Sequence, residues 1–172
     1  GRHNNTFSNN NIFVKGMDNY IYGMGVLGVV TAHAVAEGQG ATNNKFIGNT
    51  ITLEGPYFTT GIIAGDASEG TLITNNTINL NSDGVVYGIT LEMSQKSNIE
   101  SNNLKLNSQL IYGIEGISSN GNVIASNNMT ANAKISCTIL ISNGNDNIIS
   151  NNLINSNGSG EKIEFLILDF IS

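Results

Sequence analysis

The hexapeptide Ile73–Ile78, with the sequence ITNNTI, decides the fold because its pattern recurs at a nearly constant spacing. The pattern is an apolar residue, an asparagine three positions later and an aliphatic residue two positions beyond that. Five other segments share it: Phe7–Ile12, Phe46–Ile51, Ile99–Leu104, Ile124–Met129 and Ile148–Leu153. Their asparagines are separated by steps of 39, 27, 26, 25 and 24 residues. A fixed period of this length is typical of a repeat architecture.

A second motif runs in phase with the first. It reads Tyr-Gly-Ile at Tyr87–Ile89 and Tyr112–Ile114, with variants at Tyr22–Met24, Thr60–Ile62 and Cys137–Ile139. The steps from Gly61 onward are 27, 25 and 25 residues. Two motifs with one period indicate that successive units stack on one another.

Each unit contains short runs that alternate apolar and polar residues. Examples are Ile78–Asn81 (INLN), Leu104–Asn107 (LKLN) and Ile89–Glu92 (ITLE). Such alternation, with Asn, Gly and Ser between the runs, predicts short strands and tight turns. A unit of about 25 residues cannot bury its own apolar face and must stack on its neighbours. We therefore predict an all-β protein, a parallel β-helix of about six coils of 24–27 residues, in a single domain spanning residues 1–172.

The nearly constant spacing gives the asparagines a physical role. Equivalent positions on successive coils lie about 4.8 Å apart, so their amides can hydrogen-bond as a ladder. Asparagine also tolerates the left-handed conformation of a sharp turn. The aliphatic residues at positions 12, 51, 78, 104, 129 and 153 should form an inward stack. The predicted ladder consists of Asn10, Asn49, Asn76, Asn102, Asn127 and Asn151.

Composition excludes several classes of function. Seven basic residues against 13 acidic ones, for a net charge of −6 in 172 residues, argue against a nucleic-acid surface. One cysteine and two histidines cannot supply a disulfide framework or a zinc cluster. No apolar run is long enough for a membrane helix. We expect no cofactor and no metal.

This pattern of asparagine and Tyr-Gly-Ile repeats resembles the right-handed, single-stranded parallel β-helices of the pectin-lyase-like superfamily. Within that fold, the Asn-Asn-x-Ile and Tyr-Gly-Ile units are most similar to those of adhesin-like surface proteins of methanogenic archaea. The resemblance implies an extracellular or cell-surface location and a polysaccharide or cell-surface glycan as partner. Proteins with this fold include lyases, glycoside hydrolases and adhesins, so the resemblance in fold does not fix the function.

The catalytic motifs of the enzymes in this superfamily are missing. Pectate lyases use an arginine base, and the single arginine here is Arg2. The polygalacturonase motifs do not occur. We therefore expect a non-enzymatic adhesin-like or structural module that presents a rigid face to a glycan or a cell. The alternative is a polysaccharide-acting enzyme, either a glycoside hydrolase or a lyase.

Weak catalytic candidates are Glu92 and Glu115. If Ile89 aligns with Ile114, the two carboxylates lie one coil and two residues apart. Their backbone separation is then about 8 Å, inside the rough 6.5–9.5 Å range of inverting glycosidases. The preferred interpretation is that they are two solvated surface acids.

Aromatic residues form a column at Tyr22, Tyr87 and Tyr112, with Cys137 filling the same position one coil further. Tyrosines on an exposed face could bind sugar rings. More often, a tyrosine before a glycine fills a corner and hydrogen-bonds a turn. Cys137 is expected to be a buried, small apolar residue.

Two segments depart from the repeat. Residues 25–42 form an insertion loop in the first coil, where residues 29–36 could form a short helix. Near the other end, Ile163–Ile171 is apolar on both alternating faces, and such a strand needs cover on both sides. We expect a fragment of a longer repeat protein or an end-to-end contact through this strand. It could instead fold over the column as a lid.

Overall fold

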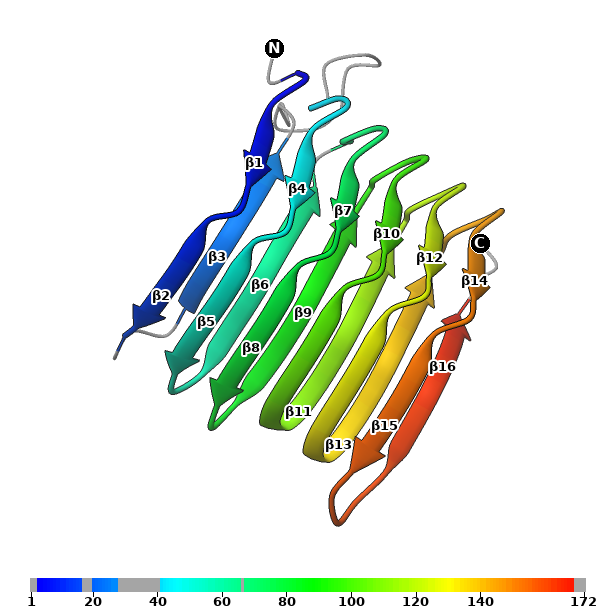
Figure 1. Cartoon of the computed structure of the whole chain (residues 1–172). Helices are drawn as coiled ribbons and strands as arrows, with labels where there is room; N and C mark the ends of the chain where they lie inside the picture. The colour runs from blue at the N-terminus through cyan, green and yellow to red at the C-terminus, as the bar shows by residue number, and fades with distance from the viewer. Residues whose placement is uncertain (1–2, 17–19, 28–40, 66, 169–172) are drawn as a thin grey trace.

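The computed structural model describes residues 3–16, 20–27, 41–65 and 67–168. This part of the chain consists of strands and turns wound into a parallel β-solenoid (Figure 1). It holds no helix of the length and apolarity needed to cross a membrane. The predicted all-β parallel β-helix is confirmed.

Six three-residue strands form one parallel sheet along the solenoid. Successive strands pair in register at steps that match the sequence period, and five turns separate the first strand from the last. The predicted turns with Asn-Asn motifs follow these strands directly. The strands are β1 (Thr6–Ser8), β4 (Lys45–Ile47), β7 (Leu72–Thr74), β10 (Asn98–Glu100), β12 (Val123–Ala125) and β14 (Ile148–Ser150).

The longer strands of each coil run out and back, so that two parallel layers face each other across the core (Figure 1). In β11 (Asn103–Ile117) and β13 (Asn128–Ser142), one continuous strand passes through both layers. The outgoing strands are β2 (Asn11–Lys15), β5 (Thr50–Gly55), β8 (Thr77–Ser82) and β15 (Leu153–Asn157). The returning strands are β3 (Tyr20–Leu27), β6 (Phe58–Gly65), β9 (Val85–Glu92) and β16 (Lys162–Leu168).

The predicted inward stack is present, with one correction. Ile51, Ile78, Leu104 and Met129 are completely buried in the core. Leu153 is 66 % exposed, so its predicted inward position was wrong. The structure pairs Met129 with residue 154, an isoleucine that packs against the core.

An asparagine ladder follows the short strands. In each coil, the side-chain Oδ1 accepts bonds from both the backbone N and the Nδ2 of the asparagine one coil earlier, at 2.8–3.0 Å. From the second ladder position onward, Nδ2 also donates to a backbone carbonyl of an earlier coil. Each amide therefore satisfies buried groups of its neighbours. The ladder consists of Asn10, Asn49, Asn76, Asn102, Asn127 and Asn152.

The prediction is thus confirmed at five positions and wrong for Asn151. Strand β14 pairs Ile149, not Ile148, with Ile124, which moves the ladder position one residue further. Asn151 is exposed and has a φ of 53°. It belongs to a separate column of left-handed residues, one before each ladder asparagine: Asn9, Gly48, Asn75, Ser101, Ser126 and Asn151. The left-handed corner and the hydrogen-bonding amide are therefore different residues.

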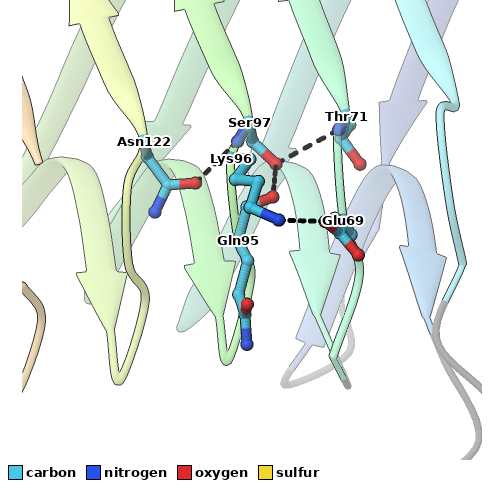
Figure 2. Close-up of polar contacts among 6 residues, drawn as sticks. All are labelled: Glu69, Thr71, Gln95, Lys96, Ser97 and Asn122. Atoms are coloured by element: carbon cyan, nitrogen blue, oxygen red, sulfur yellow. Dashed lines mark hydrogen bonds and ion pairs between the residues drawn. The ribbon is translucent and has the colours of Figure 1, made fainter. Parts of the chain in front are cut away.

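A second ladder, which the sequence analysis missed, precedes the short strands. Figure 2 shows its centre, where Ser97 lies between Thr71 and Asn122. The Thr71 backbone N donates to Ser97 Oγ at 3.2 Å, and the Ser97 backbone N donates to Asn122 Oδ1 at 2.8 Å. Asn122 in turn donates to Asn147 at 3.0 Å. Strands β7, β10 and β12 are therefore tied at both ends to the next coil by polar side chains.

The glycine of the Tyr-Gly-Ile motif has a packing role. A Cβ built on Gly61 would lie 2.6 Å from the Gly88 carbonyl oxygen and 2.8 Å from Ile78 Cγ2. The returning strand thus rests directly on the core side chains of the next coil. Only glycine fits such a close backbone approach.

Two predicted features lie partly outside the described residues. Of the insertion at 25–42, residues 28–40 are outside them, as is the whole of the candidate helix at 29–36. The C-terminal strand β16 pairs in parallel with β13, and its Ile167 is 63 % exposed. The proposed end-to-end contact through this strand stays a prediction.

Replacing Asn102 with alanine should lower the free energy of unfolding by about 2–3 kcal/mol, because the Asn76 amide and backbone N lose their buried acceptor. Urea unfolding followed by circular dichroism measures this. The matched control is Asn103→Ala, at an exposed neighbour, which should change stability by less than about 0.5 kcal/mol. Equal losses for the two variants would contradict the ladder's role.

Candidate functional sites

The tyrosine column of the returning strands is present, and its rings contact each other. Tyr87 in β9 pairs in register with Tyr112 in β11, and Cys137 follows in β13. The two rings are stacked, with centroids 5.2 Å apart and planes 12° from parallel. Tyr22 is in register with Thr60 in the same column, but its side chain lies outside the described part. One face of each stacked ring is thus covered by the other ring and is closed to a sugar.

Glu115 lies in the adjacent outward column and is buried. It pairs in register with Thr90 and Leu140, as the sequence alignment predicted for Thr90. The residue as a whole is only 7 % exposed, whereas Glu92, one coil earlier and two residues further along, is exposed. The interpretation of both carboxylates as solvated surface acids was therefore wrong for Glu115.

Burial has a direct effect on the charge of Glu115. The pKa of its carboxyl group is raised from 4.5 to about 7, first by loss of solvation and second by the negative charge of Glu92. Burial also raises the pKa of Tyr87 and Tyr112, and Glu115 adds to both shifts. The same causes raise the pKa of the Cys137 thiol to about 11, so this thiol is a poor nucleophile near neutral pH.

The strand register brings together residues whose two columns were considered separately in the sequence. We call this group the tyrosine–carboxylate cluster, formed by Tyr87, Glu92, Tyr112, Glu115 and Cys137. Among the described residues, no hydrogen-bond donor and no cation contacts the Glu115 carboxyl group. The ion pairs found in this part of the chain are Lys15–Glu54 and Lys96–Glu69, both elsewhere. No group of three His, Cys, Asp or Glu side chains capable of holding a metal occurs there either.

A second site, which we call the amide groove, lies on the outgoing strands. It is a groove of about 480 Å³ across β5, β8 and β11. At Glu54 and Asn81 it joins a depression of about 390 Å³ at the end of these strands. Its outward polar side chains are Thr52, Glu54, Asn79, Asn81, Lys105 and Asn107, and Lys15, Tyr57 and Asp83 line the adjoining depression.

The amide groove offers free hydrogen-bonding groups at fixed positions. In the described structure, neither Asn79 nor Asn81 uses its amide in a side-chain hydrogen bond, in contrast to the buried ladder asparagines. Tyr57, at the edge, is 54 % exposed. Its backbone is held in place, since its carbonyl accepts bonds from Val85 N at 2.6 Å and Ser82 Oγ at 3.0 Å. The groove therefore carries unbonded amides on paired strands, and the adjoining depression adds an exposed aromatic ring.

The signal for this groove was present in the sequence. The runs at 78–81 and 104–107 place Asn79, Asn81, Lys105 and Asn107 at alternate positions, and alternate positions share the outward face. The alternation of these runs indicates strands. Because outward polar residues are normal on solvated strands, the runs alone do not distinguish a binding groove from an ordinary surface.

Replacing Glu115 with glutamine should stabilise the protein, and the gain should grow with pH. Because the folded-state pKa is raised, folding takes up a proton between pH 4.5 and about 7. The wild type therefore loses stability as pH rises through this window. The gain in unfolding free energy at pH 8 should exceed that at pH 4.5 by roughly 2–3 kcal/mol. Urea titrations at several pH values test this.

The control for this prediction is Glu92→Gln, at the exposed partner, where we expect a smaller pH-dependent gain because only the charge repulsion is removed. A gain for Glu115→Gln that is the same at every pH would show that the buried carboxyl group is not the cause.

The chain matches no family model, no curated protein and no solved structure.

Proposed function

We propose that this chain is a non-enzymatic, adhesin-like β-helix module that presents a rigid face to a glycan. The amide groove is the observation that carries this proposal. Sugar hydroxyls both donate and accept hydrogen bonds, and an asparagine amide offers both kinds of partner. The free amides of Asn79 and Asn81 and the exposed ring of Tyr57 supply the polar and aromatic contacts that a sugar chain uses.

The rigidity of the backbone under the amide groove supports the proposal. The groove lies on strands whose neighbouring short strands are tied between coils by the asparagine ladder. A backbone fixed in this way loses little conformational entropy when a ligand binds. Because successive coils are about 4.8 Å apart, the groove presents polar side chains at a regular spacing along the solenoid axis, with Asn81 and Asn107 in register. This arrangement suits a polymer with repeating hydroxyls better than a compact ligand.

The resemblance to the pectin-lyase-like superfamily and to adhesin-like surface proteins of methanogenic archaea belongs to this proposal. It favours an extracellular or cell-surface location and a polysaccharide partner. The low content of basic residues and the net charge of −6 are compatible with that location.

A polysaccharide-acting enzyme is the second candidate, favoured by one observation. Glu115, with a pKa of about 7, could donate a proton as a general acid while exposed Glu92 acts as a base. In that case Glu115→Gln would abolish the release of products from a polysaccharide.

Retention on immobilised polysaccharides, combined with reducing-end and unsaturated-product assays, tests both candidates. We expect retention on at least one polysaccharide without products. The double variant Asn81→Ala/Tyr57→Ala should weaken retention about tenfold or more, because it removes an amide and the aromatic ring from the groove. The matched control, Asn103→Ala at an exposed position outside the groove, should bind like the wild type.

Two results would overturn the proposed function. Products that disappear in Glu115→Gln would establish the enzymatic candidate. Retention that the double variant leaves unchanged would remove the amide groove as the glycan site.

A further inference from the structure

Unpaired strand edges lie at the two ends of the solenoid (Figure 1). Among the described strands, β1, β2 and β3 at one end pair only with strands of the next coil. At the other end, β14, β15 and β16 pair only with strands of the coil before them. We call these two faces the first end and the last end. An unpaired edge presents a row of backbone N–H and C=O groups on which another chain can pair.

The last end carries amide donors without an acceptor. A primary amide has two N–H donors, and Asn102 uses both, one for a carbonyl of an earlier coil and one for Asn127 Oδ1. Asn147 and Asn152 each bond a carbonyl of an earlier coil as well. Their second Nδ2 donors have no partner in the described structure. The last end thus presents two donors where the earlier ladder asparagines bond the next coil.

The first end carries the matching acceptors. Asn5 and Asn10 donate from the backbone N and from Nδ2 to the next asparagine of their ladders. No group of the described residues donates to either Oδ1, and both asparagines are exposed. The two are five residues apart, on either side of β1, as Asn147 and Asn152 are on either side of β14. The acceptors and the donors therefore have the same spacing.

Core positions are exposed at the last end. Phe165 and Ile167 are in register with Ile139 and Ile141, which are buried in the core. Phe165 is nevertheless 47 % exposed and Ile167 63 % exposed. Together with Ile149, they line a hollow of about 330 Å³. Because these side chains occupy inward positions, another coil stacked on this end would cover them.

The first end presents apolar side chains in the corresponding columns. Phe7 is stacked on the buried ring of Phe46, with centroids 5.2 Å apart and planes 11° from parallel. Val14 is in register with buried Leu53. Phe7 is 37 % exposed and Val14 is 36 % exposed. Each end thus has an apolar centre flanked by two ladder asparagines.

We propose that the last end of one copy of this chain binds the first end of a second copy, so that the solenoid continues across the interface. Extending the strand register by one coil sets Asn10 of the second copy beside Asn152, and Phe7 of the second copy over Ile149. The other pair of ladder asparagines meets in the same way. The contact thereby continues the coil-to-coil interface that recurs within the chain.

A second copy is the partner that fits both features of the last end. A purely apolar partner would cover the hollow but leave the amide donors of Asn147 and Asn152 buried without acceptors, which is costly. The first end brings two amide oxygens and an aromatic ring together. Since different faces of the two copies meet, each added copy exposes a new last or first end, and association does not stop at two copies.

Sedimentation velocity at a series of protein concentrations tests this proposal. We expect the average mass of the wild type to rise with concentration. Ile167→Lys at the last end and Val14→Lys at the first end should each weaken association at least about tenfold, because a lysine would be buried in the interface. Ile135→Lys is the matched control, since Ile135 is 41 % exposed in β13, between the two ends. It should associate like the wild type.

Mixing the two end variants gives the sharpest result. Each variant keeps one intact end, and the two intact ends are complementary. The mixture should therefore form 1:1 dimers and nothing larger, whereas each variant alone stays monomeric. Circular dichroism checks that each variant is folded. If Val14→Lys does not fold, Asn10→Ala removes an acceptor from the same end.

Three results would overturn the proposed interface: a wild type that is monomeric at every concentration, an end variant that dimerises alone, or equal weakening by Ile135→Lys. The interface does not rest on the proposed function. Retention on polysaccharides is read separately, because the amide groove lies across β5, β8 and β11 and not on either end.

Discussion

The structure depends on one constraint: each turn must satisfy its buried backbone groups with side chains from the next coil. The amide of Asn102 accepts from Asn76 and donates both to Asn127 and to an earlier carbonyl. A single asparagine side chain thereby satisfies a backbone N–H and a backbone carbonyl of the preceding coil. The flat stacking of coils, and with it the alignment of outward columns, follows from this requirement.

Both outward sites arise from that alignment. Because the coils stack in register, Tyr87 meets Tyr112, and Glu92 comes near Glu115 although 22 residues separate the latter pair in the sequence. The same register places Asn79, Asn81 and Asn107 on one layer. Neither site needs a loop or an inserted domain. A change in one coil can therefore alter binding without altering the fold, provided that the ladder residues remain.

The features that could be predicted from the sequence are those marked by a repeated motif, and the features that were missed have no such motif. The period predicted the solenoid and five ladder positions. It failed at Asn151 because Ile148-Ile149 and Asn151-Asn152 are adjacent pairs of identical residues, and either frame fits the motif. The second ladder mixes Thr71, Ser97 and Asn122, so no single residue type marks it. Glu115 lies between Thr90 and Leu140 of the neighbouring coils, so its burial has no local signal in the sequence.

The bonds between the ladder amides all run in one direction. From Asn10 to Asn127, each Nδ2 donates to the Oδ1 of the ladder asparagine in the following coil. Each amide oxygen from Asn49 to Asn152 therefore faces the preceding coil, and the column is polar along the solenoid axis. A further coil can join it by the same bonds only if it keeps this orientation. An inverted coil would set acceptor against acceptor or donor against donor. The stack is thus directional, and its two ends differ in the way that the two surfaces of a head-to-tail interface differ.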